Sequence, residues 1–287
     1  MQYWLAWFHE GIEQAAEVAR AAERLGFQGI AVPDHVAIPE GYGSVHPSGR
    51  RIIEPHTSCP DAMITLAAMA AATSTIELMT YVYVLTMRDP FSAAKQAATL
   101  ATLSEHRFGL GVGAGWCVEE IALLGHDPST RGRRMDEMLD IMRDLWTRGE
   151  AECHGRHFDF GPVGQHPVPE RRVPVWIGGR SDRALARAAR HDGWAGMSYP
   201  MDEIETLLGR LEIERRKHVD RFGEGDLPFR RFVMPETLPS RDVYARLEDW
   251  GIDGAVAMAW PVGDPSFAPL EAKLDAMEHF AEQFISP

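Results

Sequence analysis

Cysteine is scarce in this chain of 287 residues, which contains only Cys59, Cys117 and Cys153. The three are widely spaced and odd in number, so they predict free thiols in a reducing compartment rather than a disulfide framework. Cys117 follows a run of glycines, at a point where a helix start would favour a thiolate. We favour the simpler interpretation that it is a small residue filling space.

Clustered positive charge is also missing. The net charge is −13, which argues against sequence-independent binding to nucleic acid or to an anionic membrane surface. The apolar run in the N-terminal stretch MQYWLAWFHEG is too short to span a bilayer and lacks the basic flank of a signal peptide. We therefore expect a cytoplasmic protein without a membrane partner.

The sequence has no recognisable metal or dinucleotide motif. Its histidines show no HxH or HExxH spacing, and no GxGxxG lies between a strand and a helix. Neither a metal site nor a built-in nicotinamide domain is therefore predicted. Several histidines stand mostly in polar loops, where exposure to solvent is the default interpretation: His46, His56, His106, His126, His154, His157 and His166.

The sequence does contain a regular alternation of short β-rich runs and amphipathic stretches, which is typical of βα units building a parallel sheet. The predicted strands are residues 3–8, 28–33, 77–85, 108–113, 173–178, 194–198, 229–234 and 255–259. The predicted helices are residues 12–25, 61–73, 90–103, 133–148, 182–190, 202–221, 241–250 and 269–284. This order predicts an α/β protein, a closed (β/α)₈ TIM barrel forming one domain over residues 1–287.

Two segments, 39–60 and 150–174, are too long for plain connections. Insertions of this length in a compact domain are usually lids or binding loops, so we expect insertion loops at the C-terminal face of the barrel. We expect segment 150–174 to shape a substrate pocket together with Tyr42, His46, Arg50 and His56.

The stretch FGLGVGAGW, residues 108–116, places glycine at every second position. Alternate residues of a strand share one face, so Gly109, Gly111, Gly113 and Gly115 form a bare face opposite Leu110, Val112 and Ala114. Glycine in a strand marks a bend or a close approach by a ligand or another backbone. We expect a flat ring against this face. Close helix-to-strand packing is the alternative, and the pattern leaves open which face lines the barrel.

Barrels of this kind bind ligands at the carboxyl ends of their strands. After the second strand stands His35, either a proton donor or a polar residue satisfied by its neighbour Asp34. Trp116 is expected to pack against a ring. Gly178 and Gly179 precede a helix, where free N–H groups bind phosphate, although a structural turn explains them equally well.

A second group of cationic residues opens the predicted helix that starts near residue 133. Arg131, Arg133 and Arg134 stand together there. They are candidates for gripping a phosphate or carboxylate, and solvated charges at a helix end are the alternative.

Four blocks of the sequence, LSEHRFGLGVGAGW, GRRMDEMLDIMRDLW, HGRHFDFGPV and VPVWIGGRSDRALARAARHDGW, together resemble the luciferase-like monooxygenase superfamily. The closer resemblance is to its branch of oxidoreductases that use the deazaflavin coenzyme F420. This resemblance implies a flavin or deazaflavin ring at the C-terminal mouth of the barrel, and a non-proline cis peptide near Thr80 and Tyr81. It also implies a phosphate site near Gly178, Gly179 and Ser198.

From the strand-end rule and this resemblance together, we predict His35 and Asp34 as catalytic residues. The predicted cofactor-binding residues are Asp34, Thr80, Tyr81, Gly113, Gly115, Trp116, Gly178, Gly179, Ser181, Met197 and Ser198. The sugar-phosphate dehydrogenase members of this branch resemble one another in having a glutamate at the position of Trp116. They also have a lysine near the loop that corresponds to residues 197–200 of this chain. Both are absent here, which argues against a glucose 6-phosphate substrate.

The predicted function is hydride transfer between reduced F420 and a small organic substrate. The alternative within the superfamily is an FMN-dependent monooxygenase that uses O₂ and reduced flavin from a partner reductase. A cofactor-free scaffold and a metal-dependent barrel hydrolase are the alternatives outside it. The resemblance also implies a homodimer, and a separate enzyme that reduces the cofactor.

Overall fold

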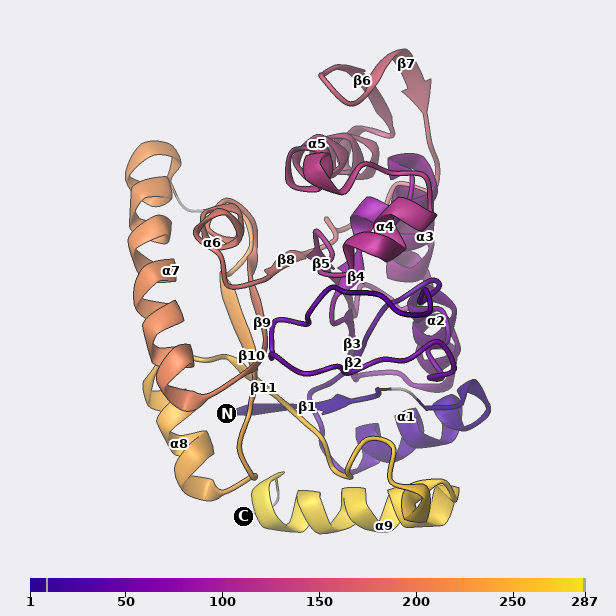
Figure 1. Cartoon of the computed structure of the whole chain (residues 1–287), viewed down its shortest axis with the longest axis vertical. Helices are drawn as coiled ribbons and strands as arrows, with labels where there is room; N and C mark the ends of the chain where they lie inside the picture. Colours follow the sequence, from indigo (N-terminus) through magenta and orange to yellow (C-terminus); the bar gives the residue numbers. More distant parts are fainter. Residues whose placement is uncertain (9, 224, 286–287) are drawn as a thin grey trace.

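A closed barrel of parallel strands forms the centre of the computed structural model, which describes residues 1–8, 10–223 and 225–285 (Figure 1). Its strands are β1 (Gln2–Ala6), β2 (Gly29–Val32), β3 (Glu77–Thr80), β4 (Tyr83–Val84), β5 (Phe108–Gly113), β8 (Val175–Gly178), β9 (Gly193–Tyr199), β10 (Arg230–Pro235) and β11 (Gly254–Ala257). They pair in the order β3-β2-β1-β11-β10-β9-β8-β5-β4, and pairing of β3 with β5 closes the ring. The predicted (β/α)₈ barrel is confirmed.

The third barrel strand is the one that departs from a regular course. Prediction gave a single strand at 77–85, but the chain forms β3 and β4 with a break between them. The peptide bond between Tyr81 and Val82 in this break is cis, one residue beyond the position that the family resemblance implied. The side chain of Val82 lines the cavity at the mouth of the barrel, next to Gly113 of β5 and Gly178 of β8.

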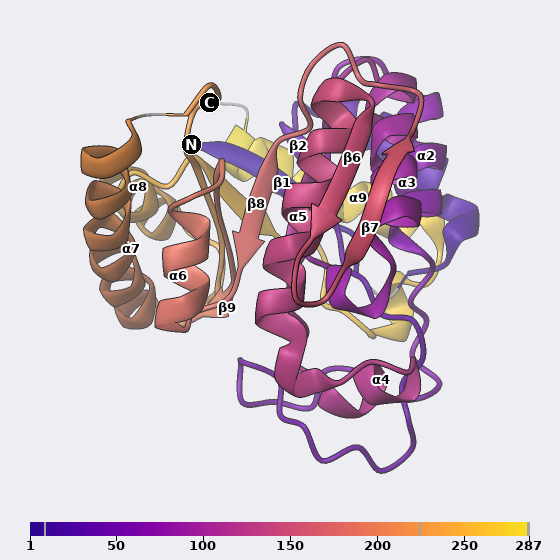
Figure 2. The ribbon, with the colours of Figure 1, turned by 90° about the horizontal axis from the view of Figure 1, so that it is seen from above.

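Helices surround the barrel and cover its outer face (Figures 1 and 2). They are α1 (Ala15–Arg24), α2 (Ala62–Ala72), α3 (Pro90–Leu103), α4 (Val118–Leu123), α5 (Arg131–Arg148), α6 (Asp182–Ala188), α7 (Met201–Phe222), α8 (Arg241–Asp249) and α9 (Leu270–Phe280). All eight predicted helices are present, and α4 is an additional one. In the described residues, none of these helices combines the length and the apolar character needed to cross a membrane.

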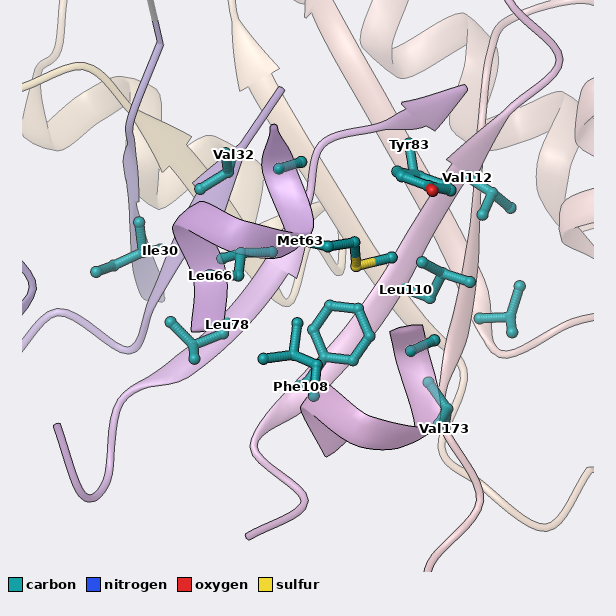
Figure 3. Packing of buried hydrophobic residues seen from close by; sticks show 14 of the residues in the cluster. Ile30, Val32, Met63, Leu66, Leu78, Tyr83, Phe108, Leu110, Val112 and Val173 are labelled. Carbon is teal, nitrogen blue, oxygen red and sulfur yellow. The ribbon is translucent and has the colours of Figure 1, made fainter. Parts of the chain in front are cut away.

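The glycine strand β5 turns its bare face inward. Leu110 and Val112 point outward into the layer between barrel and helices, where they pack in the same core as Tyr83 and Val173 (Figure 3). Inside, a Cβ on Gly109 would lie 2.1 Å from the ring of Trp176.

Two further glycines of this face lie close to neighbouring protein groups. A Cβ on Gly111 would lie 2.1 Å from the carbonyl oxygen of Thr80, and one on Gly113 would lie 2.9 Å from Val82. The expectation of a ring lying directly on this bare face is therefore wrong for Gly109 and Gly111. The glycines accommodate Trp176 and the break in the third strand.

The two long insertions have different positions. The mouth loop, which we define as residues 36–60, lies beside α4 (Figure 2). The second insertion forms the antiparallel hairpin of β6 (Glu150–His154) and β7 (Asp159–Gly164), which runs alongside α5. Three backbone N–H groups between these two strands donate to Glu137 of α5. This hairpin was not predicted.

Candidate functional site

A cavity of about 350 Å³ opens at the carboxyl ends of the strands. This volume falls in the usual range for small-molecule sites. Ten of the predicted site residues line it: Asp34, His35, Tyr81, Gly113, Gly115, Trp116, Gly178, Gly179, Ser181 and Met197. Thr80 and Ser198 are outside the lining, and the Thr80 hydroxyl donates to the Gly111 carbonyl at 2.7 Å.

Other lining residues come from segments that the prediction treated differently. The mouth loop contributes His46, Pro47 and Ile52. Of the residues expected to shape the pocket, Arg50, His56 and the whole of segment 150–174 do not line this cavity. Tyr42 acts indirectly, because its ring packs edge-on against Trp116 at a centroid distance of 5.7 Å.

His35 is held by a buried glutamate that the sequence analysis did not identify. Its Nδ1 lies 2.7 Å from Oε2 of Glu120, whose side chain is fully buried. The other oxygen of Glu120 accepts from the backbone N–H groups of Val36 and Ala37 at 2.6 and 3.0 Å. Burial acts to raise the pKa of Glu120, but the hydrogen bond and charge of His35 outweigh it, so the pKa lies below its usual value. The pair is therefore a carboxylate orienting an imidazole.

Asp34 has a structural partner. Its carboxylate forms a bidentate ion pair with Arg88, at 2.6 and 2.7 Å, and accepts from the Val84 N–H at 2.8 Å. All three donors follow the break in the third strand. Asp34 thus fastens β2 to this region, and its oxygens are already occupied by protein donors.

Trp116 lies at the centre of an aromatic group. His35, Tyr42 and His46 each pack edge-on against its indole, with centroid distances between 5.3 and 5.7 Å. The mouth loop is fixed to α4 next to this group: the N–H groups of Gly43 and Ser44 donate to Glu119 at 2.8 and 3.0 Å. The loop is therefore a wall of the cavity rather than a solvated connection.

Three arginines supply positive charge to the cavity wall near α5 and α6. Arg187 is paired with Asp136 at 2.6 Å, and Arg180 with Glu203 at 2.8 Å. Arg131 donates only to the Pro128 carbonyl, and no carboxylate of the described residues pairs with it. Arg131 is therefore the residue here that could pair with an anionic group in the cavity.

The cavity combines an apolar surface with a cation that no described carboxylate pairs with. Val82 and Tyr81 offer an apolar surface at the break in the third strand, and Arg131 offers the unmatched charge.

Both cysteines near the mouth are unsuited to thiolate chemistry, because burial raises the pKa of Cys117 and raises that of Cys59 to about 11. The space-filling interpretation of Cys117 agrees with its full burial.

Comparison with known proteins places this geometry in context. A family model described as luciferase-like monooxygenase matches residues 3–234. An uncharacterized protein of Mycobacterium tuberculosis (strain ATCC 25618 / H37Rv) is 33% identical over 275 residues, covering 94% of this chain and 93% of the relative.

Solved structures share the fold at low sequence identity. The monooxygenase RslO1 from Streptomyces bottropensis superposes with a TM-score of 0.79 at 17% identity, covering 99% of both chains. An F420-dependent secondary alcohol dehydrogenase, solved with an F420-acetone adduct, gives a TM-score of 0.75 at 17% identity, covering 100% of this chain and 99% of the other. At such identity the likeness concerns the fold, whereas the family match spans most of the sequence. The chain belongs to the luciferase-like monooxygenase family.

Proposed function

We propose that this protein is an F420-dependent oxidoreductase that moves a hydride between the deazaflavin and a small organic substrate. The observation that carries the proposal is the pair of His35 and buried Glu120 at the cavity wall. When bound, the cofactor supplies a ring carbon that gives or accepts a hydride. Reduction of a carbonyl or imine also needs a proton, and its reversal needs a proton acceptor.

His35 provides that proton partner. Glu120 accepts the Nδ1 hydrogen, which leaves Nε2 of the imidazole for exchange with a substrate atom. Asp34 has no part in this step, because Arg88 and Val84 occupy its oxygens. We therefore assign Asp34 to positioning the third strand, while Arg131, Ser181 and the backbone at Gly178 and Gly179 would hold the anionic tail.

An FMN-dependent monooxygenase is the second candidate. The match to the family and the likeness to the monooxygenase RslO1 both favour it. Carbonyl reduction by hydride needs a matched proton partner, and the pair of His35 and Glu120 can provide one, so F420 remains our first choice.

Titration of the purified protein with F420 and, separately, with FMN tests the choice. We expect F420 to bind at least tenfold more tightly, a difference of about 1.4 kcal/mol. Tighter binding of FMN would move the assignment to the monooxygenase, and no binding of either would remove both candidates. Arg131→Met should weaken the preferred cofactor, whereas Arg133→Met, at an exposed position of the same helix, is the matched control.

A further inference from the structure

His46 stands on the mouth loop, within a polar stretch that suggests exposure to solvent. It is instead 5% exposed, it lines the cavity, and its ring is perpendicular to Trp116 at a centroid distance of 5.3 Å. His35 contacts the same indole at 5.6 Å. Two imidazoles from different segments therefore flank one aromatic ring at the cavity.

The hydrogen bonds of His46 determine which ring nitrogen carries the proton. The backbone N–H of Ser48 donates to Nδ1 at 3.1 Å, and the Ser48 hydroxyl lies 2.8 Å from the same atom. A backbone N–H can only donate, so Nδ1 is the acceptor and the proton is on Nε2. Burial, with the charges of His35, Arg50 and Arg180, lowers the pKa of His46 to about 4. The ring is therefore neutral near pH 7.

His35 has the opposite arrangement. Its Nδ1 faces the Glu120 carboxylate, which can only accept, so Nδ1 carries a proton and Nε2 is the ring nitrogen left for a ligand. Neither Nε2 atom has a hydrogen-bond partner within residues 1–8, 10–223 and 225–285. The cavity wall beside Trp116 thus contains the Nε2–H donor of His46 and Nε2 of His35.

We propose that His46 is a substrate-binding residue whose Nε2–H donates to the same substrate oxygen that exchanges a proton with His35. This inference rests on the proposed function and names its substrate class: an uncharged alcohol or ketone. In the oxidative direction, the hydroxyl oxygen accepts from His46 and its proton passes to Nε2 of His35. The carbinol carbon would lose its hydrogen together with the electron pair as the carbonyl forms, and a bound deazaflavin would supply the acceptor for that hydride.

The surroundings of His46 favour a neutral oxygen over an anion. Arg50 and Arg180 are the two arginines whose charges lower the pKa of His46. Each is already ion-paired, Arg50 with Glu236 at 2.5 Å and Arg180 with Glu203 at 2.8 Å. Phe8, Ile52 and Val82 give the cavity apolar walls. A phosphate requires several charged donors, whereas a hydroxyl or carbonyl needs the single donor and acceptor present here.

The test uses the full-length protein and two probes, cyclohexanone and inorganic phosphate. Nitrogen-15 NMR of the imidazole rings should show His46 protonated at Nε2 and His35 at Nδ1 at pH 7, and cyclohexanone should shift the His46 signal. His46→Phe keeps the ring but removes the donor, so cyclohexanone affinity should fall about tenfold. His46→Gln, which keeps an N–H near the Nε2 position, should recover most of it, and the exposed His56→Phe should have no effect.

Three results would overturn the inference: protonation of His46 at Nδ1, a shift of the His46 signal by millimolar phosphate, or equal cyclohexanone affinity in wild type and His46→Phe. F420 titration of the same variants separates this inference from the proposed function. Failure of the proposed function shows as absent F420 binding with the histidine protonation unchanged. Failure of this inference shows as intact F420 binding with cyclohexanone indifferent to residue 46.

Discussion

At the scale of single residues, the buried carboxylate of Glu120 determines which ring nitrogen of His35 faces a protein partner and which remains for a ligand. Glu120 has one oxygen on His35 and the other on two backbone N–H groups, so it can neither turn nor exchange partners without leaving a buried donor unpaired. Orientation of a catalytic histidine by a carboxylate fixes the protonated nitrogen as well as the ring position. In the proposed function, Glu120 is therefore a positioning residue that acts through His35.

Glu120→Gln tests this role. The glutamine amide can donate to Nδ1 and thereby favour a His35 ring protonated at Nε2, which no longer accepts a substrate proton. We expect the rate of F420 reduction by cyclohexanol to fall roughly 100-fold or more, by analogy with triad variants of wrong tautomer. F420 affinity should change less than about twofold. The His35 ring-nitrogen signals are the second readout, and an unchanged Nδ1–H in the variant would contradict the assignment.

At the scale of elements, the short helix α4 fixes the mouth loop to the barrel. Glu119 and Glu120 stand in its first turn and accept backbone N–H groups from two separate parts of that loop, near residues 36 and 43. The Ser44 hydroxyl donates to Glu119 at 2.5 Å. This hydrogen bond, together with those from backbone N–H groups, lowers the pKa of Glu119 to about 2. The position of the mouth loop therefore depends on the ionised carboxylates of Glu119 and Glu120.

The pH dependence of this fastening is a prediction for Glu119→Gln. A carboxyl whose pKa is lower in the folded than in the unfolded state stabilises the fold above the unfolded value, and that contribution disappears as the pH falls through the folded value. Urea midpoints of wild type and variant should therefore differ at pH 7 and converge between about pH 4.5 and about pH 2. Glu40→Gln, exposed on the same loop, should show no such convergence. A difference that grows on acidification would contradict the hydrogen-bonded role of Glu119.

The sequence predicted correctly those elements whose residues follow a local periodic pattern. Strand and helix periodicity located all eight barrel strands, and the strand-end rule found His35 and Trp116 at the cavity. Glu120 was missed because an acidic residue in the first turn of a short helix ordinarily faces solvent. Its burial depends on His35, which lies 85 positions away in the chain. The environment of Asp34 likewise depends on Arg88, and no local pattern signals either pairing.

The glycine strand β5 shows the same limit of prediction from local pattern. The alternation in residues 108–115 correctly indicated a close approach, but the approaching groups are Trp176 and the third strand. Which partner fills a bare strand face depends on barrel closure, because β5 meets both β3 and β8 only when the sheet is complete. The sequence therefore predicted the space and not its occupant.

At the scale of the whole molecule, the two ends of the barrel have separate tasks. The carboxyl end carries the cavity, and the amino end is closed by Arg230, which donates to Glu77 at 2.6 Å and to Gln2 at 2.5 Å. The Arg230 guanidinium also lies 4.7 Å from the ring centroid of Phe232, one of the interior aromatics. This closure joins β1, β3 and β10 around the aromatic core. It supports the barrel on the side opposite to the site.

The variant Arg230→Met tests whether the two ends of the barrel act independently. Loss of two side-chain hydrogen bonds and a cation–π contact should lower the free energy of unfolding by about 1–3 kcal/mol. Because the cavity is at the opposite end, F420 affinity should stay within about twofold of wild type while the protein remains folded. Arg216→Met, which removes an exposed pair with Glu212, should change stability by less than about 0.5 kcal/mol. Urea unfolding and F420 titration of the same preparations measure both quantities, and a parallel loss of cofactor affinity would show that the two ends are coupled.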